Sequence, residues 1–99
     1  MTDTPAAPAH QLSQVVKITN KRGLHARASA KFVTLAAGQP CAIEVEKEGS
    51  KVAGTSIMGL MMLGAGPGST VLLTADGFDA KEALNAIAAL IEAGFHETD

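Results

Sequence analysis

The sequence predicts an α+β domain, namely a four-stranded antiparallel sheet with three helices on one of its faces. Runs of alternating or β-branched residues and runs of helical spacing follow one another in the order β-α-β-β-α-β-α. Each helical run is apolar along one side only, and an antiparallel sheet can leave its second face in water, so a single layer of helices satisfies this order. The 99 residues provide one hydrophobic core with no room for a second. Periodicity alone leaves a ferredoxin-like arrangement open as an alternative.

Residues 1–14 are expected to form a flexible N-terminal tail, and residues 15–99 the folded domain. The tail contains two prolines and no apolar periodicity, and it lacks the basic start and apolar core of a secretory signal. His10 is expected to be a bystander within it. The longest apolar stretch, residues 57–66, is too short to span a membrane, so we expect a soluble, cytoplasmic protein without membrane insertion.

The first strand is predicted at residues 15–19, where Val16 and Ile18 alternate towards one face. A turn-like loop follows, and residues 26–37 then have the spacing and the alanine content of a helix that stops at Gly38. The apolar stripe of this helix comprises Phe32, Val33, Leu35 and Ala36.

A hairpin is predicted next in the chain. Residues 42–46 alternate, with Ile43 and Val45 facing inward. A short charged turn follows, and residues 51–53 begin the returning strand. The single Cys41 has no partner for an internal disulfide and no metal-ligand spacing around it, so we expect it to be buried and predict no metal site.

Ser56 is placed to cap a short helix over residues 57–63. This segment has more apolar side chains than a helix of one or two turns can bury. We expect Ile57 and Leu60 to face the core and some of the methionines to lie at the surface, where methionine adapts to different partners. An arrangement with all of these side chains in the core is the alternative.

Residues 69–75 are predicted to form the last strand, with a turn at Asp76–Gly77. Asp79 is then expected to cap a long helix, with Glu82 completing a capping box. The terminal residues 96–99 are expected to fray. The buried stripe of the long helix is predicted to comprise Ala83, Leu84, Ile87, Leu90 and Ile91.

Composition argues against one class of partner. The formal net charge is −2, and the chain has three phenylalanines but no Trp or Tyr. A nucleic-acid-binding domain relies on positive charge and on aromatic faces that stack on bases. We therefore expect no nucleic-acid partner.

His25 stands where the first strand-like run has ended and the first helical run begins. A helix start offers unpaired backbone N–H groups and the positive end of the helix dipole, which together favour an anion. With Arg27 two residues on, His25 would be a nucleophile beside an anion cradle. The simplest chemistry for that pair is to accept a phosphoryl group and pass it on. A solvated loop histidine is the alternative for a lone residue of this type.

Two motifs carry a family resemblance. The residues GLHARASA resemble the active-site motif of HPr, the histidine-containing phosphocarrier of bacterial phosphotransferase systems. The residues TSIMGLMMLGA at 55–65 resemble the regulatory-serine segment of that family. Both motifs stand in register with the same order of elements over roughly residues 15–95. The resemblance implies the open-faced β-sandwich of that family.

The resemblance implies that the δ nitrogen of His25 accepts a phosphoryl group from the phosphoenolpyruvate-dependent enzyme I and passes it to EIIA-type proteins. Such a protein is a carrier rather than an enzyme, because it is modified and then restored. We expect Arg27 to hold the phosphate, together with the backbone N–H groups of Ala26 and Arg27. We also expect a monomer that needs no cofactor. Partner docking is assigned to Leu24, Ala28, Ile57, Met58, Leu60 and Met61.

Ser56 is the second candidate site, since the resemblance suggests regulation by an HPr serine kinase/phosphorylase. A phosphate on Ser56 would favour the helix cap but would place negative charge on the docking face. The family motif usually has proline after the arginine, whereas this chain has Ala28. We expect that difference to alter phosphate affinity or partner choice modestly.

Two functions of other classes stay open. A reversible anion- or metabolite-sensing module would bind its ligand at the helix start without covalent phosphotransfer. A purely regulatory interaction protein would work through Ser56 and the methionines, although it would have no need for His25 beside Arg27. The sequence does not separate a carrier of the sugar-uptake branch from one of the nitrogen-related branch.

Overall fold

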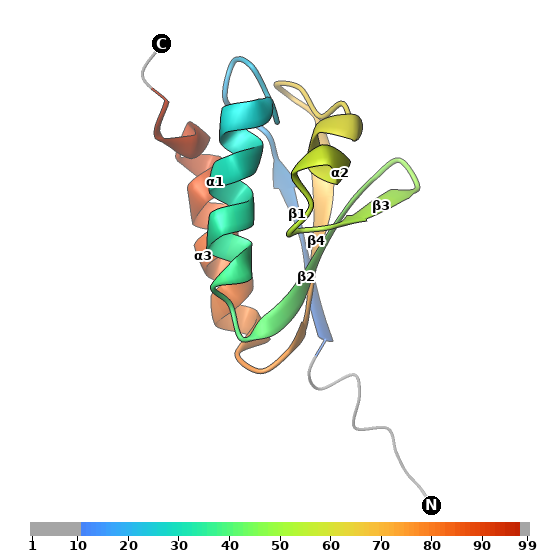
Figure 1. The fold of residues 1–99 in the computed structure, drawn as a ribbon, viewed down its shortest axis with the longest axis vertical. Helices are drawn as coiled ribbons and strands as arrows, with labels where there is room; N and C mark the ends of the chain where they lie inside the picture. Colours follow the sequence, from blue (N-terminus) through green and yellow to red (C-terminus); the bar gives the residue numbers. More distant parts are fainter. Residues whose placement is uncertain (1–10, 98–99) are drawn as a thin grey trace, which may run out of the picture.

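The computed structural model describes residues 11–97 as a four-stranded sheet with helices packed on one side (Figure 1). Within this range, no helix is long and apolar enough to cross a membrane. The elements are β1 (Gln11–Lys17), α1 (Ala26–Ala37), β2 (Cys41–Lys47), β3 (Ser50–Ala53), α2 (Ile57–Met62), β4 (Thr70–Gly77), α3 (Ala80–Glu92) and the 3₁₀ turn η2 (Gly94–His96).

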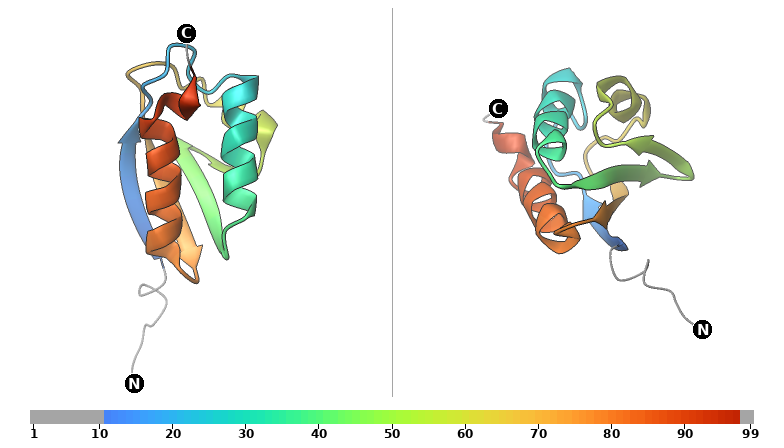
Figure 2. Two further views of the ribbon diagram at one scale, coloured as in Figure 1. Left: turned by 90° about the vertical axis from the view of Figure 1, so that its left-hand side faces the viewer. Right: turned by 60° about the horizontal axis from the view of Figure 1, so that its bottom comes forward.

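The sheet is antiparallel throughout, with the strand order β1-β4-β2-β3. The last strand in the sequence, β4, therefore holds the first strand and the β2–β3 hairpin together. Two views show α1 and α3 side by side over one face of the sheet, and α2 packs against α1 and β3 (Figure 2). The predicted α+β class and the predicted open-faced β-sandwich are confirmed.

The hydrophobic core forms between the sheet and the helices. The residues that alternation predicts to face inward, in and just after β1 and in β2, are buried. They are Val16, Ile18, Ile43 and Val45. The helices complete the core with Phe32 from α1, Leu60 from α2 and Ile87 from α3. The bounds of α1 agree with the prediction at both ends.

The first strand begins earlier than predicted. Residues 11–14 belong to β1, where they pair with β4, so their assignment to a flexible tail is wrong. The reason is tertiary, because β4 offers pairing partners to a polar segment that has no apolar alternation of its own. Residues 1–10, including His10, lie outside the described residues.

The chain turns between β4 and α3 later than predicted. β4 runs on through Asp76–Gly77, because these residues pair with the ends of β1 and β2, so the predicted turn at that point is wrong. The chain turns instead at Phe78 and Asp79, and Asp79 has a left-handed φ of 56°. The Asp79 side chain makes no cap hydrogen bond in that conformation, so the predicted capping box with Glu82 is also wrong.

Helix α2 turns only one side to the core. Leu60 is fully buried as predicted, but Ile57 is 40% exposed, so the expectation that it faces the core is wrong. The three methionines of α2 are 41–80% exposed, which confirms the expectation of methionine at the surface. Cys41 is half-buried rather than buried. In α3 the predicted stripe is buried except for Leu90, which is half-buried.

The loop between β1 and α1 packs closely against the loop before β4. Gly23 has a φ of +64°, and a Cβ built on it would lie 2.2 Å from the carbonyl oxygen of Ala65. The next residue, Leu24, donates its backbone N–H to the same oxygen at 2.9 Å. Because only glycine fits this close approach, Gly23 fixes where the chain enters α1.

Replacing Gly23 by alanine should destabilise the fold more than the matched change at Gly49. Gly49 also has a positive φ of +87°, but nothing lies within 4 Å of a Cβ built there. Gly49→Ala should cost only left-handed strain, about 1–2 kcal/mol, whereas Gly23→Ala adds a steric clash and should cost about 2–5 kcal/mol. Urea unfolding of both variants measures the difference in the free energy of unfolding. Equal losses would contradict the role given to Gly23.

Candidate functional site

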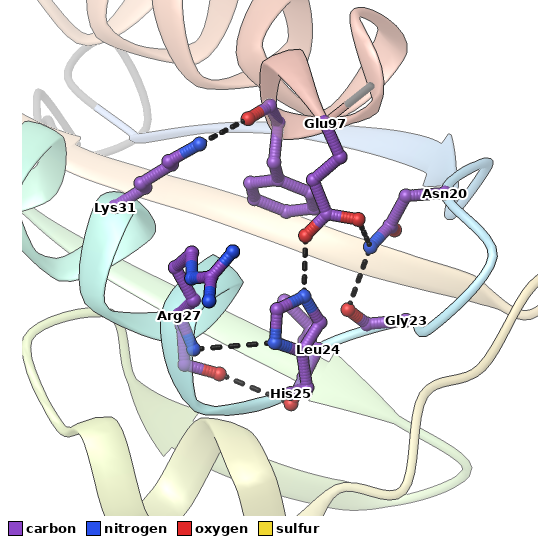
Figure 3. A network of polar contacts seen from close by, with 9 residues as sticks. Asn20, Gly23, Leu24, His25, Arg27, Lys31 and Glu97 are labelled. Atoms are coloured by element: carbon purple, nitrogen blue, oxygen red, sulfur yellow. Dashed lines mark hydrogen bonds and ion pairs between the residues drawn. The ribbon is translucent and has the colours of Figure 1, made fainter. Parts of the chain in front are cut away.

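His25 is the N-cap residue of α1, with a φ of −75° and a ψ of −179°. Its Nδ1 atom accepts a hydrogen bond from the backbone N–H of Arg27 at 3.3 Å (Figure 3). Its carbonyl oxygen accepts the first helical hydrogen bond, from the N–H of Ser29 at 2.8 Å. Since an N–H group only donates, the contact with Arg27 requires Nδ1 to carry a lone pair rather than a proton. The side chain of His25 therefore caps the helix with an unprotonated nitrogen.

The other ring nitrogen faces a carboxylate from the far end of the chain. His25 Nε2 and Glu97 Oε2 form a short polar contact (Figure 3). The second oxygen of Glu97 accepts a hydrogen bond from Asn20 Nδ2 at 3.1 Å. The same amide nitrogen donates to the carbonyl oxygen of Gly23 at 2.8 Å. Asn20 thus ties the carboxylate to the loop before α1, and His25 is held from both sides.

Glu97 reaches this position because η2 is anchored in the core. Phe95 is fully buried, and its carbonyl oxygen accepts a hydrogen bond from Lys31 Nζ at 2.6 Å. Phe95 and His96 have left-handed φ values of 57° and 60°. Residues with side chains keep such values only where surrounding contacts impose them. The prediction of a frayed terminus is therefore wrong as far as Glu97, and residues 98–99 lie outside the described residues.

Hydrogen bonds keep the carboxylate of Glu97 charged. The bond with His25, followed by the bond from Asn20, lowers the pKa of Glu97 from its ordinary value, and the nearby Lys31 acts in the same direction. Burial of the Glu97 side chain, which is 11% exposed, raises the pKa, but the two hydrogen bonds outweigh this effect. Glu97 therefore faces the imidazole ring as an anion at neutral pH. Sequence reasoning missed it because nothing local marks a glutamate in a polar terminus.

Arg27 lies on the first turn of α1, beside His25, and its side chain is exposed (Figure 3). In the part of the chain that the structure describes, its guanidinium forms no ion pair. The exposed Ala26 precedes it, so the backbone N–H groups of both residues stand at the helix start. The structure thus brings together His25, the predicted phosphoryl acceptor, and the two residues predicted to hold the phosphate, Ala26 and Arg27.

Three residues assigned to partner docking are buried. Leu24, Ala28 and Leu60 are at most 6% exposed and belong to the core, so these assignments are wrong. Their small or apolar side chains serve packing beneath the helices. The exposed apolar residues of α2, which we call the α2 apolar face, are Ile57, Met58, Met61 and Met62. Met62 is the only one of these four residues that is not among those predicted to dock partners.

A depression of about 330 Å³ lies beside the ring of His25. Its walls include Arg22 from the loop before α1 and Met61 from α2. His25 and Met61 border the same depression, so one residue of the α2 apolar face lies close to His25. Within residues 11–97, no cluster of three His, Cys, Asp or Glu side chains could hold a metal ion.

Ser56 is the N-cap residue of α2, as predicted. Its Oγ atom accepts a hydrogen bond from the backbone N–H of Gly59 at 3.0 Å. The residue as a whole is half-buried. Ser56 therefore stands at the start of the helix that carries the α2 apolar face.

Comparisons with known proteins point to one family. The family model described as "PTS HPr component phosphorylation site" matches residues 12–93. The chain is 49% identical over 86 residues to phosphocarrier protein HPr of Cupriavidus necator, covering 87% of this chain and 97% of that protein. It is 42% identical over 87 residues to phosphocarrier protein NPr of Shewanella violacea, covering 88% and 96%. The crystal structure of HPr-C-His from Thermoanaerobacter tengcongensis matches with a TM-score of 0.84 and 44% identity, covering 89% of this chain and 99% of that chain.

The lowered pKa of Glu97 predicts how its contribution to stability depends on pH. A carboxyl group whose pKa is lower in the folded state stabilises the fold above its unfolded pKa, about 4.3 for glutamate, and loses this effect as pH falls through the folded value. Wild type should therefore be more stable than Glu97→Gln at pH 5, and the difference should shrink towards pH 2.5.

Denaturant unfolding at the two pH values measures this difference. Glu92→Gln is the control, because Glu92 is an exposed glutamate at the end of α3 that has no contact with His25 in the structure. It should show no comparable change. A difference between wild type and Glu97→Gln that is equally large at both pH values would contradict the charged contact.

Proposed function

This chain belongs to the HPr family of the bacterial phosphotransferase system, and on that premise we propose that it carries a phosphoryl group on Nδ1 of His25. The observation that supports this most directly is the lone pair of Nδ1 at the N-terminus of α1. A lone pair makes the nitrogen a nucleophile. The helix N-terminus and the Arg27 guanidinium would receive the negatively charged oxygens of the phosphoryl group.

In the proposed step, the Nδ1 lone pair attacks the phosphorus held by an enzyme I-type donor. The bond between phosphorus and the donor breaks, and its electron pair returns to the donor. The N–H of Arg27 then loses Nδ1 as its acceptor and binds a phosphate oxygen instead. Transfer to an EIIA-type acceptor repeats the exchange and restores the ring. The chain thus acts as a carrier, and the catalysis of each transfer rests on positioning and charge.

Partner proteins would dock over the α2 apolar face. Met58 and Met62 are 70% and 80% exposed, and flexible methionines suit contact with more than one partner. Lys21 and Arg22 are exposed in the loop before α1 and would favour partners with acidic groups around their own active sites. We propose that donor and acceptor use this surface in turn, each contacting one monomer of the carrier.

Ser56 would regulate docking rather than the chemistry at His25. A phosphate on Ser56 would lie at the N-terminus of α2, which its charge favours. The same charge would lie beside the α2 apolar face and repel an acidic partner. An HPr serine kinase/phosphorylase would supply this modification.

The carrier function predicts which variants are labelled from phosphoenolpyruvate. Wild type and His10→Ala should take up radioactive phosphate in a lysate of a bacterium that has a phosphotransferase system, whereas His25→Ala should not. The label should be lost in acid and survive alkali, since the phosphorus–nitrogen bond of a phosphohistidine is acid-labile. Absence of label in wild type, with a second carrier labelled in the same lysate, would contradict the carrier function and favour a reversible anion sensor.

Negative charge at position 56 should weaken docking without unfolding α2. Aspartate and asparagine both cap helices well, so Ser56→Asp and Ser56→Asn keep the cap and differ in charge. With enzyme I as the donor, Ser56→Asp should raise the KM for the carrier about tenfold, while Ser56→Asn should remain close to wild type. Equal KM values for the two variants would show that charge at this cap does not control docking.

A further inference from the structure

We propose that Glu97 is a positioning residue for phosphoryl transfer. Its carboxylate holds His25 in the tautomer with the proton on Nε2, and it stabilises the positive charge that the ring acquires when Nδ1 bonds phosphorus. This inference rests on the proposed function of His25 as the phosphoryl carrier. It adds a residue outside the stretch matched by the family model, which ends at residue 93.

The two contacts of the ring require the same tautomer. The backbone N–H of Arg27 only donates, so Nδ1 must be the acceptor in that contact. An ionised carboxylate only accepts, so the proton between the ring and Glu97 belongs to Nε2. A neutral imidazole carries one proton, and here both neighbours place it on Nε2. The lone pair is therefore on Nδ1 before any donor arrives.

The charge of Glu97 becomes more important as the reaction proceeds. When a neutral ring with a proton on Nε2 attacks through Nδ1, both nitrogens become substituted and the ring acquires a positive charge. The carboxylate of Glu97 already touches Nε2, so it stabilises this charge without rearrangement. The proton stays on Nε2 throughout. When the phosphoryl group leaves for an acceptor, the bonding electron pair returns to Nδ1 and the ring is neutral again.

The same contact prevents reaction at the wrong nitrogen. Nε2 is covered by the carboxylate oxygen of Glu97, and a negative charge at that position repels the oxygens of an incoming phosphoryl group. The ring keeps 21% of its side-chain surface exposed, and Nδ1 is the nitrogen on the helix side. Glu97 would therefore direct the phosphoryl group to Nδ1 as well as activate that nitrogen.

The position of Glu97 is built into the fold rather than accidental. Fully buried Phe95 anchors η2, Lys31 binds its carbonyl oxygen, and Asn20 binds the second carboxylate oxygen. Two consecutive left-handed residues, Phe95 and His96, are held in place to bring the chain back over His25. Residues that orient metal ligands through hydrogen bonds commonly change affinity or activity about 10–100-fold when they are replaced, and Glu97 holds the ring of His25 by the same kind of contact.

The test combines the tautomer of His25 with the rate of transfer. The tautomer is read from the ¹⁵N chemical shifts of the histidine ring in the full chain at a pH where the ring is neutral. The transfer rate is measured with purified enzyme I and phosphoenolpyruvate. The variants are Glu97→Gln, which keeps the shape and removes the charge, and Glu97→Asp, which keeps the charge. Glu92→Gln is the control for the loss of one exposed carboxylate.

We expect wild type to show the proton on Nε2 alone. Glu97→Gln should show a mixture of tautomers and a kcat about 10–100-fold lower, with an unchanged KM for the carrier because Glu97 lies outside the α2 apolar face. Glu97→Asp should recover part of the rate, and Glu92→Gln should match wild type. A Glu97→Gln variant with the wild-type tautomer and the wild-type rate would overturn the inference. Wild type that takes no phosphate on His25 would instead overturn the carrier function itself.

Discussion

The imidazole of His25 is held between a group that can only donate and a group that can only accept, and the chemistry of the site depends on this pair of contacts. The N–H of Arg27 donates to Nδ1, and the carboxylate of Glu97 faces Nε2. A ring held in this way has one orientation and one nitrogen with an available lone pair. The same ring in a solvated loop would turn freely and offer either nitrogen. The helix start then places that lone pair beside backbone N–H groups suited to a phosphate.

Both contacts depend on segments that lie far apart in the sequence. The loop before α1 is fixed from one side by the loop before β4, where Gly23 approaches Ala65. It is fixed from the other side by the C-terminal segment, where buried Phe95 sets the path of the chain to Glu97. The sheet order explains why these segments meet, because β1 and β4 are neighbours and α3 packs over both. The fold therefore orients the ring and does not merely support the helix that begins beside it.

Several local features could be predicted from the sequence, whereas the contacts between distant segments at the site could not. The bounds of α1 and the Ser56 cap follow from residues within one or two turns, so propensity and capping rules were sufficient. Glu97 contacts a residue 72 positions away, and its path needs left-handed residues that carry side chains, which no propensity rule favours. The prediction that Leu24 docks partners was wrong for a related reason. An apolar residue next to the candidate site can belong either to the surface or to the core. Only the packing decides between them.

The measurement that tests the central claim most directly is the position of the phosphorus–nitrogen bond in the phosphorylated chain. Coupling between ³¹P and the ¹⁵N nuclei of labelled histidine identifies the bonded nitrogen in solution. The contacts of His25 predict coupling to Nδ1 alone, with the proton retained on Nε2. Phosphorus bonded to Nε2 would contradict the central claim, because the carboxylate of Glu97 covers that nitrogen in the structure.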